Sequence, residues 1–311
     1  MRVFRGVDSI GTGFQKPVVT IGNFDGVHVA HQELINTAKN LAAEHHGDVV
    51  ILTFWPHPSK VLASGKAVAL LQTLEQRLES IARFGVAAVI VEQFDKVLAA
   101  LTPEQFVATK LVGQLRTCAL VVGDDFRFGV RRSGNTEMLR ELTTKYGIDL
   151  TFVAPRMIDG ERISSSSIRR LVKSGDVSRV QQFLGRPFET VGRVIHGDHR
   201  GRQLGWPTAN ILSATELTPK AGIYAGRASV DGHWFAAAIS LGVRPMFQFD
   251  GVKLEAHLLD FSGDLYGKEL VIQWLSFLRE EARFGSLEAL KAAIAADVSS
   301  TRTLVGPYHA G

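Results

Sequence analysis

The sequence holds a single cysteine, Cys118, among its 311 residues. One thiol can form neither an internal disulfide nor a cysteine-rich zinc site. Cys118 lies in the apolar run Thr117–Val122, so we interpret it as a buried core thiol rather than a catalytic nucleophile. A chain without disulfides is typical of a reducing compartment, and we therefore expect a cytoplasmic protein.

Long hydrophobic runs and blocks of basic residues are also missing. No stretch approaches the roughly 18–20 apolar residues that cross a bilayer. In residues 1–8, polar residues interrupt the apolar ones too early for the apolar core of a signal peptide. We expect neither a membrane nor a nucleic acid as a partner. The net charge of +4 lies wholly in residues 1–185, which carry 22 Lys+Arg and 18 Asp+Glu, whereas residues 186–311 carry 13 of each. This mild surplus is compatible with phosphorylated small molecules.

The first half of the sequence alternates strand and helix patterns. Two capping boxes, Thr73–Gln76 and Thr102–Gln105, mark helix starts. Apolar runs separated by amphipathic helices predict a doubly wound α/β domain, with a parallel sheet covered on both faces and ligands at the carboxyl ends of its strands. The expected strands are 17–21, 49–54, 86–91, 119–122 and 150–153, and the expected helices are 31–44, 73–84, one from 102 and 135–146.

The pattern changes near Gly185–Phe188, so we predict two domains, 1–185 and 186–311. Beyond this point short strand patterns follow one another with no helix between them, which favours a small closed antiparallel β-barrel. Ser286 then caps an expected final helix to about residue 297. The expected barrel strands are 190–195, 223–230, 234–241, 253–260 and 270–278.

A first group of candidate site residues lies in Gly22–His31, between the first strand and the first helix. His28 and His31 are three residues apart and share a face of the first helical turn. Free backbone N–H groups and the helix dipole favour phosphate there, and two imidazoles could hold a triphosphate. The plainer alternative is one exposed histidine and one core histidine at a helix start.

A second group lies in the barrel. The sequence has no P-loop motif, yet phosphoryl transfer needs a metal and a group that orients the attacking hydroxyl. Thr208 and Asn210 offer hard oxygen ligands for Mg²⁺. Glu255 is a lone acid in an apolar strand and needs a partner or a task. The plainer alternatives are a turn at Thr208 and Asn210 and a solvent-facing Glu255.

These blocks, together with Thr53–Pro58, Gly123–Gly129, Arg162–Arg169 and Leu254–Gly267, resemble the bacterial bifunctional riboflavin kinase/FAD synthetases. The resemblance implies that the barrel phosphorylates riboflavin with ATP to FMN and that the first domain adenylylates FMN with ATP to FAD. In the kinase it implies Glu255 as the base and Thr208 and Asn210 around Mg-ATP. In the first domain it implies catalytic roles for His28, His31 and Arg169.

The same resemblance places further residues at the nucleotide or the flavin. For His57 a structural role is an equal alternative, and core packing is an equal alternative for at least one of Phe126 and Phe128, which could stack on the flavin. Residues Gly197–Gly201 would form a flap over the nucleotide. The full set of expected binding residues is Gly22, Asn23, Phe24, Asp25, Gly26, His57, Asp124, Phe126, Phe128, Asn135, Ser164, Ser165, Ser166, Gly197, Arg202, Pro207 and Arg279.

Two departures from the family pattern bear on function. Ala30 stands where the family has glycine between the two histidines, and its methyl crowds the approach of phosphate to the backbone. Met246 stands where a threonine usually follows Arg-Pro, which removes a hydroxyl near the kinase site. Two alternatives therefore accompany the bifunctional enzyme: a riboflavin kinase with weakened or lost adenylyl transfer, and a non-catalytic flavin- or nucleotide-binding regulator.

Overall fold

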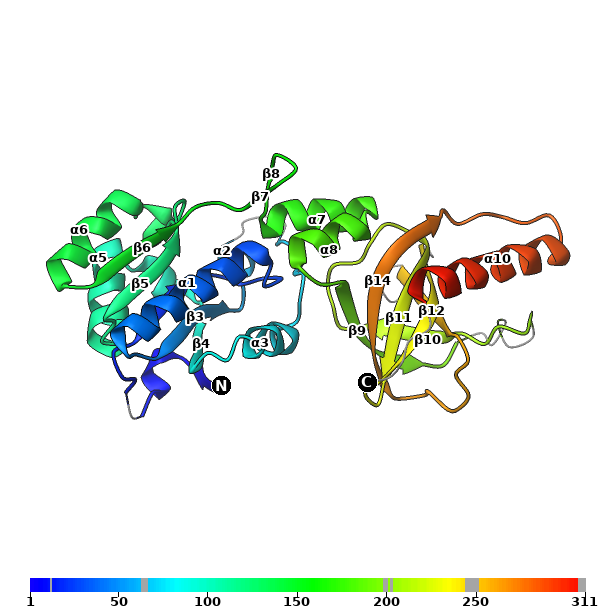
Figure 1. The fold of residues 1–311 in the computed structure, drawn as a ribbon, viewed down its shortest axis with the longest axis horizontal. Coiled ribbons are helices and arrows are strands. Elements are labelled where there is room, and N and C mark those ends of the chain that lie inside the picture. The colour runs from blue at the N-terminus through cyan, green and yellow to red at the C-terminus, as the bar shows by residue number, and fades with distance from the viewer. Residues whose placement is uncertain (12, 63–66, 198–200, 202–203, 244–251, 307–311) are drawn as a thin grey trace. The chain divides into compact units, whose positions relative to one another are not determined.

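The computed structural model describes all residues except 12, 63–66, 198–200, 202–203, 244–251 and 307–311 (Figure 1). The chain divides into two compact units. Unit 1 comprises Met1–Ala69 and Leu74–Ser164, and unit 2 comprises Leu70–Thr73 and Ser165–Gly311. Residues 165–185, which the sequence analysis assigns to the first domain, thus cluster with the barrel. The division of the two activities at 185/186 stays a prediction.

Unit 1 is built on a six-stranded parallel sheet in the order β1-β4-β3-β2-β5-β6, which confirms the expected doubly wound layout. The first strand, β1, was not expected; it is a four-residue edge strand whose side chains are mostly exposed. The strands of the sheet are β1 (Arg2–Arg5), β2 (Val18–Ile21), β3 (Val49–Trp55), β4 (Ala88–Gln93), β5 (Ala119–Gly123) and β6 (Asp149–Val153).

Helices cover both faces of this sheet, because successive side chains of the buried strands point to opposite faces. On one face Ile51 and Val89 pack with Ile35 of α1, and on the other Val50 and Leu52 pack in a second cluster. The helical elements of unit 1 are α1 (Val29–His45), α2 (Pro58–Leu62), α3 (Leu74–Ala82), α4 (Lys96–Ala100), α5 (Pro103–Phe106), the π-helical η2 (Val107–Gln114) and α6 (Thr136–Tyr146), with short 3-10 turns η1 (Val7–Ser9) and η3 (Val130–Arg132). A small hairpin joins β7 (Met157–Ile158) to β8 (Glu161–Arg162).

Unit 2 is a closed antiparallel barrel in the order β10-β13-β12-β11-β14-β9, with one helix pair before it and one long helix after it (Figure 1). Trp274 and Tyr224 fill its interior, and the Trp274 indole N–H donates to Thr190 Oγ1 at 2.9 Å. Its elements are α7 (Ser165–Ser174), α8 (Val177–Leu184), β9 (Phe188–Ile195), β10 (Ala209–Ser213), β11 (Gly222–Val230), β12 (His233–Val243), β13 (Val252–Leu258), β14 (Glu269–Arg279) and α10 (Leu287–Val305).

Three features of unit 2 differ from the sequence prediction. The barrel has a sixth strand, β10, where Thr208 and Asn210 had no assigned element. Two helices, α7 and α8, lie in a stretch for which the sequence predicted no element. The final helix runs to Val305 rather than to about 297, because Thr301 and Val305 are buried. No helix in the described ranges is long and apolar enough to span a membrane.

Candidate active sites

In unit 1 the two histidines lie together at the start of α1. His28 is the N-cap residue, and its Nδ1 accepts the backbone N–H of His31 at 3.3 Å. The two rings stack with centroids 3.6 Å apart and an angle of 14°. Since Nδ1 of His28 is an acceptor, its other ring nitrogen can carry the proton. The predicted pair therefore forms one unit rather than one exposed and one core histidine.

His31 is held as a neutral imidazole. Burial, then the neighbouring His28, then Arg77 lower the pKa of His31 well below its usual 6.5. Its Nδ1 is buried, and no hydrogen-bond partner for it is found among the described residues. A neutral imidazole at a helix start can donate one hydrogen bond to an anionic oxygen without charging.

The turn that precedes the histidines has an unusual backbone. Phe24 and Val27 have positive φ angles of 49° and 40°, where bulky and β-branched residues are rare. Phe24 is fully buried and contacts His31 with ring centroids 5.0 Å apart. The backbone carbonyl of Asn23 accepts the Thr53 hydroxyl at 3.1 Å, which ties this turn to the end of β3. Gly22 and Gly26 complete the turn.

Asp25, which the resemblance places at the cofactor, is fully buried in this turn. Its carboxylate lies 3.9 Å from the guanidinium of Arg77, a residue of α3 that is also fully buried. The sequence alone does not indicate Arg77 as a site residue, since an arginine in an amphipathic helix normally faces solvent.

The other predicted residues of unit 1 lie at the same, carboxyl edge of the sheet. His57 follows β3, and its Nδ1 accepts the Ser59 backbone N–H at 3.2 Å. Phe126 and Phe128 follow β5 and stack at 5.5 Å, with Phe128 buried in the core. Asn135 caps α6 by accepting the Met138 N–H at 2.9 Å, so its carbonyl oxygen has a structural partner.

The block that contains Arg162 is split between the two units. Arg162 lies 2.7 Å from Asp125 and 3.9 Å from Asp124, which joins the predicted Asp124 to this block within unit 1. Ser164 ends unit 1, whereas Ser165, Ser166 and Arg169 lie on α7 in unit 2. Their expected contact with the triphosphate stays a prediction.

One cavity of unit 1 contains none of the predicted site residues. It has a volume of about 700 Å³ and is lined in part by Arg5, Trp55 and Leu98. A Lys110–Glu92 ion pair of 2.7 Å stands on its wall, and Glu92 also accepts the Val7 N–H at 2.7 Å. Through these contacts Glu92 links β4 to η1 and η2, which is a structural role.

In unit 2 the strand register brings the predicted kinase residues together. Asn210 of β10 is the direct partner of Glu255 on β13 in the antiparallel ladder. Directly opposed side chains in such a ladder share a face and lie close together. The Thr208 hydroxyl, just before β10, donates to Glu255 Oε1 at 3.4 Å. Residues 45 and 47 positions apart in sequence thus form one oxygen-rich cluster.

The segment before β10 packs tightly on this cluster. A Cβ on Gly197 would stand 2.1 Å from Asn210 Nδ2, so a larger residue there would have to displace this side chain. The carbonyl of Pro207 is 2.8 Å from His257 Nδ1, which fixes the chain next to Thr208. Arg202, Met246 and most of the expected flap lie outside the described residues.

Two cavities meet at Thr208. The first, of about 450 Å³, is lined by Pro207, Phe261, Asp264 and Tyr266 among others. The second, of about 280 Å³, has a largely apolar lining and contains Glu255. Thr208 lines both, which makes it the shared boundary of two adjacent ligand-sized spaces. Apolar residues of the second cavity include Trp206, Ile223, Ile239, Phe284, Leu290 and Ile294.

Two ion pairs at this site were not predicted. Lys253 Nζ lies 2.9 Å from Glu255 Oε1, on the same face of β13. Arg279, expected at the cofactor, donates from Nε and Nη2 to the two Asp297 oxygens at 2.9 and 2.7 Å, and both residues line the second cavity. Arg279 therefore joins the end of β14 to α10.

The donor set of this cluster suits a hard cation. A hydroxyl, an amide carbonyl and a carboxylate on Thr208, Asn210 and Glu255 are the oxygen ligands that Mg²⁺ takes, together with water and substrate phosphates. The described residues hold no group of three or more His, Cys, Asp or Glu placed to bind a metal, so the cluster does not resemble a zinc centre.

Comparison with known families identifies both halves of the chain. The sequence model of FAD synthetase matches residues 12–167, and that of riboflavin kinase matches residues 184–305. Bifunctional riboflavin kinase/FMN adenylyltransferases from Escherichia coli K12 and Pseudomonas fluorescens are each 37% identical over 308 residues, covering 98% and 99% of both chains, respectively.

A relative of the same name from Bacillus subtilis is 36% identical and covers 91% of this chain and 90% of its own. Among solved structures, a Streptococcus pneumoniae protein described as a macrolide-efflux protein superposes with a TM-score of 0.90 at 28% identity, over 96% of this chain and 98% of its own. The two family matches lie one after the other along the chain, and the relatives match it over nearly its full length. The chain therefore belongs to the family of bifunctional riboflavin kinases/FMN adenylyltransferases.

Proposed function

We propose that the two activities of this flavin-synthesising enzyme are divided between residues 1–185 and 186–311. The barrel transfers the γ-phosphoryl group of ATP to riboflavin and forms FMN. The N-terminal domain transfers the AMP group of a second ATP to FMN and forms FAD and pyrophosphate. The observation that carries the kinase assignment is the Thr208–Glu255 contact at the boundary of two cavities.

In the kinase step, the largely apolar cavity takes the flavin and the adjoining one takes the nucleotide. Glu255 accepts the proton of the riboflavin 5′-hydroxyl as that oxygen bonds to the γ-phosphorus, and the bond to the ADP oxygen breaks. Thr208, on the boundary, touches both reactants. Lys253 holds the Glu255 carboxylate in place from the neighbouring position on the strand.

Thr208 and Asn210 would hold Mg²⁺, as the chemistry of their oxygens allows. The metal supplies charge neutralisation on the triphosphate when bound. Gly197, packed on the Asn210 amide, sets the orientation of that side chain. Arg279 positions α10 along the flavin cavity through Asp297.

In the adenylyl transfer, a phosphate oxygen of FMN bonds to the α-phosphorus of ATP and pyrophosphate leaves. This step needs no base, because the attacking oxygen is already anionic. His28 and His31 donate hydrogen bonds to the phosphates at the start of α1, where the helix dipole adds favourable charge. Ser164, the last residue of unit 1, supplies a further donor to the triphosphate.

The two alternatives are not favoured. Ala30 lies half-buried in the first turn of α1, and its methyl leaves the stacked pair of His28 and His31 in place. The FAD synthetase match spans Ala30, and the relatives that match over the full chain carry both activities in their names. A non-catalytic regulator would not need the Thr208–Asn210–Glu255 cluster.

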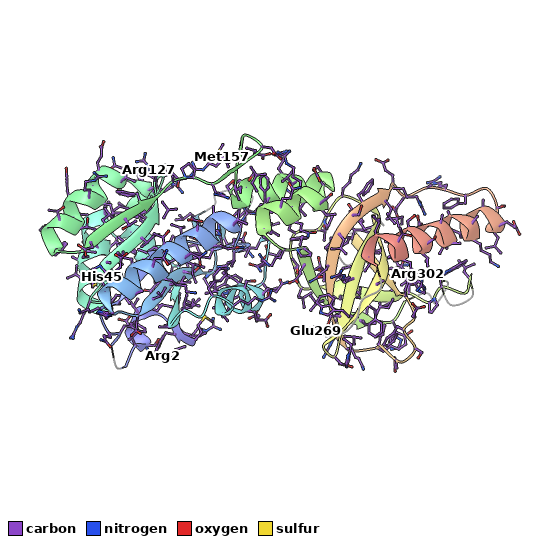
Figure 2. All side chains as sticks on the ribbon, viewed as in Figure 1. Arg2, His45, Arg127, Met157, Glu269 and Arg302 are labelled. Atoms are coloured by element: carbon purple, nitrogen blue, oxygen red, sulfur yellow. The ribbon has the colours of Figure 1, made fainter. Side chains whose placement is uncertain are left out.

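Products resolved by chromatography after incubation with riboflavin, ATP and Mg²⁺ test the assignment. The wild type should form FMN and then FAD. Glu255→Gln should lower FMN formation by about 10²–10⁴-fold but still convert added FMN to FAD, whereas His28→Ala should accumulate FMN. Glu269→Gln, on an outer strand end of the barrel (Figure 2), and His45→Gln, at the far end of α1, serve as matched controls. Normal FMN formation by Glu255→Gln would refute the assigned base.

Both steps consume ATP, and we propose the cytoplasm as the site of action. Cell fractionation should place the chain with the cytosolic ATP-using enzymes. Recovery of the chain in an extracytoplasmic fraction would contradict this.

A further inference from the structure

Arg77 is an arginine with no exposed surface, on a helix next to the adenylyl-transfer site. It lies on α3, and its side chain is fully buried. A buried guanidinium is costly unless charged and polar partners compensate the loss of water. Its burial therefore indicates a task that a hydrophobic residue of similar size would not perform.

The partners of Arg77 come from the segments that build that site. Its guanidinium lies 3.9 Å from the Asp25 carboxylate, with side-chain exposures of 0% and 1%. It also donates to the backbone carbonyl of Phe54 at 3.4 Å, and it lies over the Trp55 ring at 5.6 Å. One cation thus joins α3, the end of β3 and the turn before α1.

The turn that carries Asp25 needs such a restraint. On either side of Asp25, Phe24 and Val27 have positive φ angles, which strain a bulky and a β-branched residue. Such conformations persist only where surrounding contacts over-determine them. The next residue after Val27 is His28, so any relaxation of the turn moves the stacked histidine pair.

We propose that Arg77 is a positioning residue for adenylyl transfer: it clamps Asp25 beneath the strained turn and so keeps His28 and His31 stacked at the start of α1. This inference rests on the proposed role of the histidines. Arg77 touches neither FMN nor ATP and acts through the turn.

The electrostatics agree with that geometry. The titratable and charged groups that act on His31 are His28 on its own turn and Arg77 on α3, and both, after burial itself, lower the pKa of His31. The loss of the guanidinium should therefore move the titration of His31 to higher pH. A purely structural arginine, remote from the histidines, would leave that titration unchanged.

Three single variants test the proposal in the full-length enzyme. Arg77→Met removes the charge and keeps the length, Arg77→Lys keeps the charge, and Arg83→Met changes an exposed arginine just after the same helix. We expect Arg77→Met to lower kcat for FMN adenylylation at least tenfold, with riboflavin phosphorylation by the same chain unchanged. His31, assigned in the NMR spectrum with His31→Gln, should titrate at higher pH. Arg77→Lys should recover part of both effects, and Arg83→Met should match the wild type.

Unchanged adenylylation together with an unchanged His31 titration in Arg77→Met would overturn the proposal. If Arg77→Met unfolds unit 1, the double variant Asp25→Asn/Arg77→Met removes both buried charges and tests the proposal in its place. A rate of FAD formation within twofold of wild type overturns the proposal. A tenfold loss in a folded chain supports it. If His28→Ala still forms FAD normally, the proposed function of the histidines fails, a result that is separate from the behaviour of Arg77.

Discussion

The backbone of Gly197 lies directly on the side chain of Asn210. A Cβ added at position 197 would come within 2.1 Å of the Asn210 Nδ2 and 2.4 Å of its Cγ. Carbon and nitrogen cannot approach this closely, so any other residue at 197 must displace either the amide or the chain above it.

Gly197→Ala should therefore damage the kinase and spare adenylyl transfer. A displacement of about 1 Å at a catalytic group can cost roughly 100-fold in rate, and we expect a loss of this size in FMN formation. Gly285→Ala, where the added methyl meets nothing within 4 Å, is the control. Steady-state assays of both half-reactions measure the effect, and a Gly197→Ala enzyme with a normal kinase rate would contradict it.

Asp297→Asn should weaken riboflavin binding. The carboxylate of Asp297 accepts two hydrogen bonds from Arg279 on the wall of the flavin cavity, and loss of a charged acceptor costs about 2 kcal/mol of stability. We expect a higher KM for riboflavin and a lower unfolding midpoint.

The control is an ion pair made by another arginine, Arg302, on the same helix as Asp297. Asp260 accepts two hydrogen bonds from Arg302, at 2.7 and 2.9 Å, but both side chains are exposed. Asp260→Asn should leave KM and the unfolding midpoint unchanged, because exposed ion pairs contribute little. Equal effects of the two substitutions would show that burial at the cavity is not what matters.

The stability of the chain should depend on pH through His31. Below pH 6.5 the unfolded chain binds a proton at this residue, whereas the native imidazole stays neutral because its pKa is lowered. The unfolded state then binds more protons, so the free energy of unfolding falls as pH drops through 6.5 and levels off below the native pKa. Urea unfolding at about pH 7.5 and about pH 5.5 should show a smaller loss for His31→Gln than for the wild type. His233→Gln, at an exposed site, should lose as much as the wild type.

Cys118 should react slowly with alkylating reagents. Burial, and then the Asp149 carboxylate, raise the pKa of its thiol, which reduces the fraction of reactive thiolate. The residue is only partly buried and packs against the core cluster that includes Ile51 and Val89. We expect Cys118→Ala to keep both activities and to abolish labelling by iodoacetamide. Fast labelling at neutral pH would contradict the raised pKa.

The elements with a strong periodic signal could be predicted from the sequence. The buried strands β2–β5 and the partly buried β6 are recognisable as apolar runs, and the helix α1 as an apolar stripe. Thr102–Gln105 forms the predicted capping box. In the barrel, the sequence indicates Thr208, Asn210 and Glu255 as site residues, although it predicts no strand at Thr208 or Asn210. The register of β10 with β13 brings Asn210 and Glu255 together as that grouping requires.

What could not be predicted depends on tertiary contacts. Three serines open α7, and serine is a weak helix former, so packing against α8 and the burial of Ile168 and Leu171 are what reveal a helix there. The end of α10 contains Ser299, Ser300 and Thr301, yet Thr301 is buried and the helix continues. The burial of Arg77 has no local signature at all, because its partners Asp25 and Phe54 come from other segments.

The two sites are supported by different kinds of structure. Asn210 and Glu255 sit on adjoining strands of a closed barrel, so their spacing persists as long as the ladder between β10 and β13 does. His28 and His31 depend on one short turn with two residues of positive φ. On gradual heating, FAD formation should thus be lost before the barrel unfolds. There should be a range of temperature in which the enzyme still forms FMN but no longer converts it to FAD.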